Sequence, residues 1–210
     1  MPIMLQLGFR LDFSLINAGF IPDGGGEVKA TIRPAQALRP FICQERGELI
    51  HIRGLSGLAN LEDRIAKRQK HQALMRLYEI YQDSKIKTVR LPSPGKGTFI
   101  LLKVDFFHCG SACFSGLGVP GKLAERVADE ADDQLLLFLE TNGAVAHYLA
   151  DQLLLPLAVI HERSIFRTNQ ITQHLITNAH VIREFLPAKS EIKGRLDRPG
   201  LIKIKGVSLK

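Results

Sequence analysis

The spacing of apolar and polar residues divides the chain into strands and helices of ordinary length. Alternation over residues 10–20 and again over 27–35 predicts two strands. The Gly24–Gly26 run between them predicts a tight turn, so these segments are expected to form a hairpin. Further strands are predicted at 47–59, 85–91 and 97–107, and in a closing hairpin of 189–196 and 200–209.

Longer segments with helical spacing alternate with these strands. Helices are predicted at 61–82, 122–142, 144–161 and 169–186. Asn60 is the expected N-cap of the first. Segment 108–121 is predicted to be a loop, and a short connection precedes residue 169.

The order of these elements predicts an α/β (α+β) fold with one domain inserted into another. Residues 47–141 read strand–helix–strand–strand–helix, which makes a compact unit of domain size. The flanking segments 1–46 and 142–210 are each too small to fold well alone, so we expect them to pack together as a discontinuous large domain. No low-complexity segment interrupts this pattern.

Charge and hydrophobicity describe a basic globular chain. It has 210 residues, 45% of them hydrophobic, with a formal net charge of +7 and a pI of about 9.5. Excess Lys and Arg favour polyanionic partners such as RNA, although a solvated basic surface gives the same numbers. No signal peptide and no membrane span are predicted, because no apolar stretch is long enough.

The three cysteines predict thiols rather than a disulfide framework. Their number is odd and their spacing is irregular: they are Cys43, Cys109 and Cys113. Unpaired thiols suit a reducing, cytoplasmic location. Cys109 and Cys113 could supply half of a metal site, but no second pair is suitably placed, so no metal ligand is predicted.

One helical face carries three different polar functions. Tyr148, Asp151 and Gln152 stand at i, i+3 and i+4, which places them together. A ring can stack on a base, a carboxylate can accept from a ribose hydroxyl, and an amide can donate to a phosphate. The same spacing also describes a plain solvated face.

A histidine lies within the next predicted helix. His174 could act as a nucleophile if one ring nitrogen is neutral and the other is held by a partner. Asn178, one turn later, could help to orient it. The alternative is an ordinary core or surface histidine.

Several motifs in order resemble the RNA 3′-terminal phosphate cyclase family. They occupy residues 18–28, 38–61, 147–158 and 166–186. Within the first, Gly19–Gly26 fits the family pattern G-x-x-P-x-G-G-G, although Ala18 stands where the family usually has Arg or His.

The resemblance implies an ATP-dependent ligase that acts on RNA 3′ ends. The histidine of H-L-x-T-N, here His174, would attack the α-phosphate of ATP to form histidine–AMP. The adenylyl group would pass to an RNA 3′-phosphate, and the neighbouring 2′-hydroxyl would close the 2′,3′-cyclic phosphate. Mg²⁺ would neutralise phosphate charge. By the same resemblance Tyr148, Leu149, Ala150, Asp151 and Gln152 would bind ATP.

The resemblance also implies a large domain of β-α-β-α-β-β units that is only partly represented. Family members carry an upstream region with further ATP-phosphate and metal ligands, so this chain matches the C-terminal part. A separate chain is one expected source of the upstream region. The alternative function is a non-catalytic RNA- or ribosome-precursor-binding protein, a branch that lacks the histidine.

Overall fold

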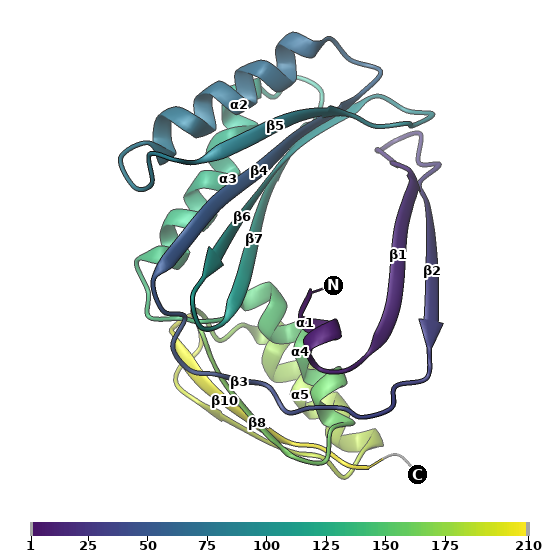
Figure 1. The fold of residues 1–210 in the computed structure, drawn as a ribbon, viewed down its shortest axis with the longest axis vertical. Coiled ribbons are helices and arrows are strands. Elements are labelled where there is room, and N and C mark those ends of the chain that lie inside the picture. Colours follow the sequence, from purple (N-terminus) through teal and green to yellow (C-terminus); the bar gives the residue numbers. More distant parts are fainter. Residues whose placement is uncertain (1, 209–210) are drawn as a thin grey trace.

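The computed structural model describes residues 2–208, in which five helices and three β-sheets are found (Figure 1). The helices are α1 (Pro2–Gln6), α2 (Asp63–Leu77), α3 (Ala124–Leu139), α4 (His147–Ala158) and α5 (Gln173–Phe185). The strands are β1 (Arg10–Asn17), β2 (Glu27–Arg33), β3 (Ile42–Cys43), β4 (Leu49–Ala59), β5 (Lys85–Arg90), β6 (Gly97–Phe106), β7 (Gly110–Leu117), β8 (Arg163–Thr168), β9 (Lys189–Lys193) and β10 (Gly200–Lys205).

The first sheet has the order β3-β8-β10-β9 and packs against α1, α4 and α5. Strand β3 runs parallel to β8, whereas β10 is antiparallel to both β8 and β9. Phe166 and Ile202 point from the sheet into the apolar core, where Leu153 and Leu175 meet them from the helices. This core joins the start of the chain to its last third.

The second sheet has the order β5-β4-β6-β7, with α2 and α3 on one face. In β6 the alternation is complete: Ile100, Leu102 and Val104 are fully buried, and the residues between them are only partly covered. The buried set packs against Ala73 and Leu135 of the helices. The other face carries no helix and looks toward the β1–β2 hairpin (Figure 1).

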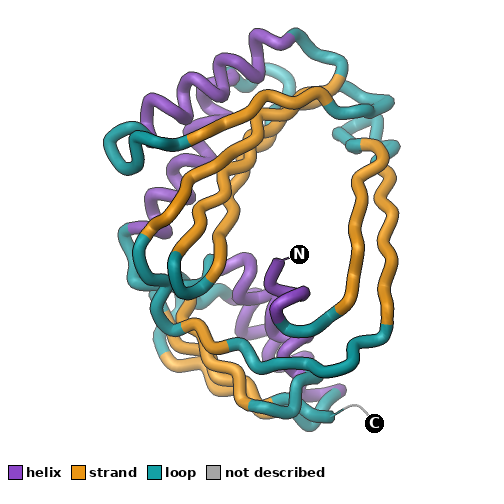
Figure 2. The backbone as a smooth tube through the Cα atoms, viewed as in Figure 1, coloured by secondary structure: helices purple, strands orange, loops and turns teal. Residues whose placement is uncertain are grey.

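The β1–β2 hairpin stands apart from both sheets and spans the distance between them (Figure 2). Its strands pair antiparallel, and every residue of β2 is exposed. The tip is anchored to the loop before β6: Ala18 N–H donates to the Pro92 carbonyl over 2.8 Å. The Phe20 ring lies where a Cβ of Gly97 would stand, so this position requires glycine.

Two features fasten the connections between the two sheets. Arg46 donates to three backbone carbonyls at and beyond the end of α3. Cys43 and Cys109 form a disulfide with a Cα–Cα distance of 5.5 Å, so the expectation of three unpaired thiols is wrong. The missed signal is spatial: 66 residues separate the two cysteines along the chain.

The α+β fold class and most of the predicted elements are confirmed. The hairpin turn is also confirmed, with φ of 66° at Gly24 and 71° at Gly25. The prediction of a loop over residues 108–121 is wrong, because this segment contains β7. The prediction of a short connection before residue 169 is also wrong, because that segment contains β8. Small residues and glycines in β7 gave a weak strand signal.

The start of α2 also differs from the prediction. Glu62, not Asn60, is its N-cap residue. Asn60 instead adopts a φ of 53°, and its side-chain amide donates to the carbonyls of Ser93 and Gly95. Asn60 therefore stabilises the neighbouring loop before β6 and does not cap the helix.

We propose that the domain division is 1–46 with 142–210 against 47–141. The separate apolar cores of the two sheets support it. Among residues 2–208, none of the helices combines the length and apolarity needed to span a membrane.

Candidate nucleotide site

Helices α4 and α5 begin at the same end of strand β8. The N–H groups of Ala144 and Val145, just before α4, both donate to the Arg167 carbonyl over 2.9 Å. The Asn169 N–H, just before α5, donates back to the Val145 carbonyl. The segments that lead into the two helices are therefore neighbours.

The apolar spacing of each helix decides which side chains remain free. Leu153, Leu154 and Leu157 commit one side of α4 to the core, as Leu175 and Ala179 do for α5. The Thr172 hydroxyl caps α5 by accepting from the Leu175 N–H over 3.1 Å, so the helix starts at a defined residue. The polar residues between the core positions face outward.

The predicted site residues on α4 fall into two groups. Tyr148 is 62% exposed, Gln152 is exposed and Asp151 is half-buried. Ala150 is fully buried, and Leu149 packs partly against the same core. The outward group supplies a ring, a carboxylate and an amide, whereas the inward pair holds the helix in place.

His174 and Asn178 lie on the exposed side of α5. The Asn178 side-chain amide donates to an Asp151 carboxylate oxygen, which joins the second turns of the two helices. Tyr148 and His174 each stand one turn, about 5.4 Å, nearer the helix starts. Because both helices start at the same edge, Tyr148 and His174 lie on the same side of this contact.

The contact changes the expected role of Asn178. Sequence spacing suggested that its amide orients His174, but no hydrogen bond joins them in the part of the chain that the structure describes. Asn178 instead holds the Asp151 carboxylate. His174 is exposed, so apolar side chains do not enclose it.

His147 is a neighbour of the site that the sequence did not single out. Its ring centroid lies 4.0 Å from that of Tyr148. Burial lowers the pKa of His147, and the Asn169 side chain beside it opposes part of that shift. The half-buried imidazole thus backs the exposed tyrosine ring. Its position directly before Tyr148 in the sequence is the signal that could have indicated its place beside the site.

Other candidate motifs lie away from α4 and α5. The Gly24–Gly26 run turns the hairpin next to Pro94, and Cys113 lies on β7. No group of three or more His, Cys, Asp or Glu side chains among residues 2–208 is arranged to hold a metal ion.

Comparison with known proteins gives the same family as the motifs. The family model described as RNA 3′-terminal phosphate cyclase matches residues 1–192. The chain belongs to the RNA 3′-terminal phosphate cyclase family. The match includes both α4 and α5, so the candidate site lies inside the shared region.

Curated relatives of the cyclase family carry the same name. An RNA 3′-terminal phosphate cyclase from Pseudomonas fluorescens is 37% identical over 193 residues, which cover 92% of this chain and 55% of the relative. One from Methanopyrus kandleri is 33% identical over 206 residues, 95% of this chain and 58% of the relative. The chain spans just over half the length of these relatives.

Proposed function

We propose that this chain takes part in the ATP-dependent conversion of an RNA 3′-terminal phosphate to a 2′,3′-cyclic phosphate. The observation that carries the proposal is the joining of α4 to α5 by the Asn178–Asp151 contact, with His174 accessible beside it. Membership of the cyclase family supplies the reaction class.

In this proposal the α4 face binds the nucleotide. The exposed Tyr148 ring stacks on adenine, and the half-buried His147 behind it fixes the ring position. Asp151, held by Asn178, accepts from a ribose hydroxyl, and Gln152 donates to a phosphate oxygen. Leu149 and Ala150 shape this segment through its backbone and its packing.

His174 carries the covalent step. An unprotonated ring nitrogen attacks the α-phosphorus, a P–N bond forms, and the bond to the β-phosphate oxygen breaks, which releases pyrophosphate. An oxygen of the RNA 3′-phosphate then displaces the histidine, and the 2′-hydroxyl expels AMP. The activation converts a phosphate oxygen, which leaves poorly, into AMP, which leaves readily.

ATP and Mg²⁺ belong to the proposal in different ways. The exposed ring and amide of α4, together with its half-buried carboxylate, suit ATP. Residues 2–208 offer no group of three or more His, Cys, Asp or Glu side chains that would hold a magnesium ion. The cytoplasmic location predicted from three unpaired thiols loses that support, because Cys43 and Cys109 form a disulfide. The matched relatives give no support to a separate partner chain.

The direct test uses ATP labelled at the α-phosphate. Incubation of the chain with this ATP and Mg²⁺ is expected to give protein-bound label that acid removes, as a phosphoramidate requires. The label should be lost in His174→Ala and kept in His180→Ala, since His180 is an exposed histidine of the same helix. Label that survives His174→Ala contradicts the proposal.

A second function, RNA binding without catalysis, is favoured by the basic face of the β4–β7 sheet. Absence of label together with salt-sensitive RNA binding would select it.

A further inference from the structure

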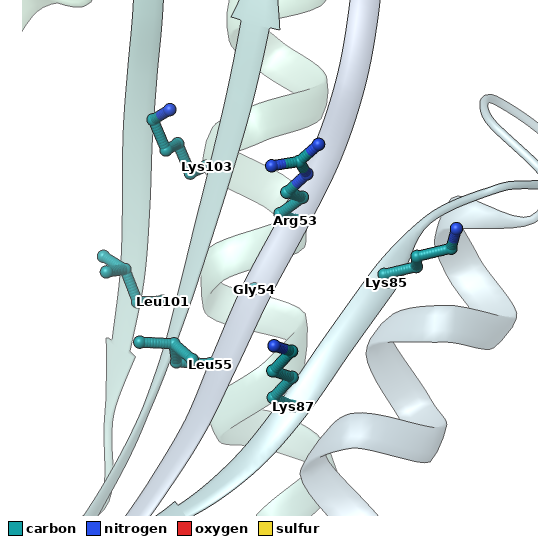
Figure 3. Close-up of a pocket in the computed structure, with 7 residues that line it drawn as sticks. All are labelled: Arg53, Gly54, Leu55, Lys85, Lys87, Leu101 and Lys103. Atoms are coloured by element: carbon teal, nitrogen blue, oxygen red, sulfur yellow. The ribbon is translucent and has the colours of Figure 1, made fainter.

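The face of the second sheet that carries no helix bears a cluster of cations. Strand register places Lys85, Arg53 and Lys103 side by side on β5, β4 and β6. Lys87 lies two residues further along β5, on the same face. Figure 3 shows these side chains on the side of the strands away from the helices.

Carboxylates neutralise only part of this charge. Lys103 pairs with Asp105 over 2.6 Å, and Lys85 reaches Asp83 over 3.4 Å, where both side chains are largely exposed. Arg53 and Lys87 make no ion pair within the described part of the chain. Their charges are therefore available to an anionic ligand.

Apolar groups lie between the cations. Leu55 and Leu101 line the same hollow, whose volume is about 470 Å³. The next pair of residues on this face, beyond Leu55 and Leu101, is Gly57 and Phe99. The Phe99 ring covers Gly57, and a Cβ at position 57 would collide with it. Glycine at this position allows the ring to lie close to the sheet.

We propose that this face binds the phosphate backbone of single-stranded RNA, with unpaired bases against Phe99 and the leucines. A strand spacing of about 4.8 Å makes the Lys85–Arg53–Lys103 row roughly 10 Å long, enough for more than one phosphate. Cations beside an aromatic ring on an open sheet suit single strands, whose bases are free to stack.

Charge selects this occupant over the alternatives. A second copy docked face to face would oppose cations with cations. An apolar polypeptide would desolvate Arg53 and Lys87 without pairing them. The inference rests on the proposed function, because RNA held here would be the body of the strand whose 3′ end is processed.

The test measures binding of a fluorescent single-stranded RNA with a 3′-phosphate by anisotropy at several salt concentrations. We expect Arg53→Gln with Lys87→Gln to weaken binding about 25-fold near 0.1 M salt, since each phosphate contact contributes about 0.7 log unit per decade of salt. The slope of log affinity against log salt should fall by about 1.4.

The matched control removes two positive charges from α2, on the opposite side of the second sheet. Lys67→Gln with Lys70→Gln alters two cations of α2 and should change affinity less than about twofold. An equal loss in both double variants would overturn the inference, because binding would then follow net charge alone.

Cys113 supplies a second readout, since it lies beside Lys103 in the same row and is exposed and free. Desolvation raises the pKa of its thiol, so alkylation is followed at mildly alkaline pH. RNA should slow this alkylation. If RNA leaves it unchanged, the inference fails, and protection by increasing protein concentration alone would identify a second copy as the occupant.

The labelling assay separates the two proposals. His174→Ala should bind RNA as the unaltered chain does, and the Arg53/Lys87 variant should still accept the adenylyl group. Absence of label with intact, face-dependent RNA binding defeats the proposed reaction and leaves the RNA face standing.

Discussion

Replacement of Arg46 by alanine is predicted to destabilise the fold strongly, although Arg46 is only half-buried. Its guanidinium donates to the carbonyls of Phe138, Leu139 and Gly143 over 2.9, 2.8 and 3.1 Å. It also lies 5.3 and 5.0 Å from the ring centroids of Phe106 and Phe138. One side chain thus closes the end of α3 and holds the two chain segments that connect the sheets.

The magnitude follows from these contacts. Hydrogen bonds from a charged donor contribute about 1.5–3 kcal/mol each, and stacking on aromatic rings adds about 1 kcal/mol. Desolvation, which lowers the pKa of Arg46, opposes this sum. The bonds share one group and are not additive. We therefore expect Arg46→Ala to reduce the free energy of unfolding by about 4 kcal/mol.

Urea denaturation followed by far-ultraviolet circular dichroism measures this change. The free energy of unfolding of Arg46→Lys should lie between those of the unaltered chain and Arg46→Ala, because an ammonium group cannot hydrogen-bond to all three carbonyls as the planar guanidinium does. Arg39→Ala is the control, since Arg39 is exposed and its side chain makes no hydrogen bond among the described residues. A loss below about 1 kcal/mol, or one equal to that of Arg39→Ala, would refute the reasoning.

Two further predictions concern stability. Cys109→Ser opens a disulfide that spans 66 residues and should cost about 4 kcal/mol by loop closure, whereas Cys113→Ser should change little; equal midpoints in urea would contradict this. Desolvation raises the pKa of Asp132 from 3.8 to about 7, so the folded state keeps a proton that the unfolded state loses. Stability should therefore fall as pH rises from about 4 to 7, and Asp132→Asn should remove that slope and stabilise the chain at about pH 8. A slope that persists in Asp132→Asn would rule out this origin.

Local pattern predicted the elements whose periodicity is strong. The α3 and α4 helices and β6 have regular apolar spacing that determines both type and buried face. Strand β7 escaped prediction because its small residues carry little strand preference, and its burial comes from α3 packing on it. Contacts distant in sequence decide such segments.

The candidate site shows the same division. Spacing alone grouped Tyr148, Asp151 and Gln152 on one face of a helix. Only the tertiary arrangement, in which α4 and α5 start at one end of β8, links Asp151 to Asn178. The placement of His147 behind Tyr148 also depends on burial, which one sequence does not display.

Mass spectrometry of peptides from the chain after incubation with ATP and Mg²⁺ tests most directly whether His174 and the α4 face form one nucleotide site. We predict an adenylyl group on His174 that disappears in Tyr148→Ala and persists in Tyr148→Phe, since only the ring is required. An adenylyl group on another residue, or modification of His174 that does not depend on Tyr148, would contradict the account.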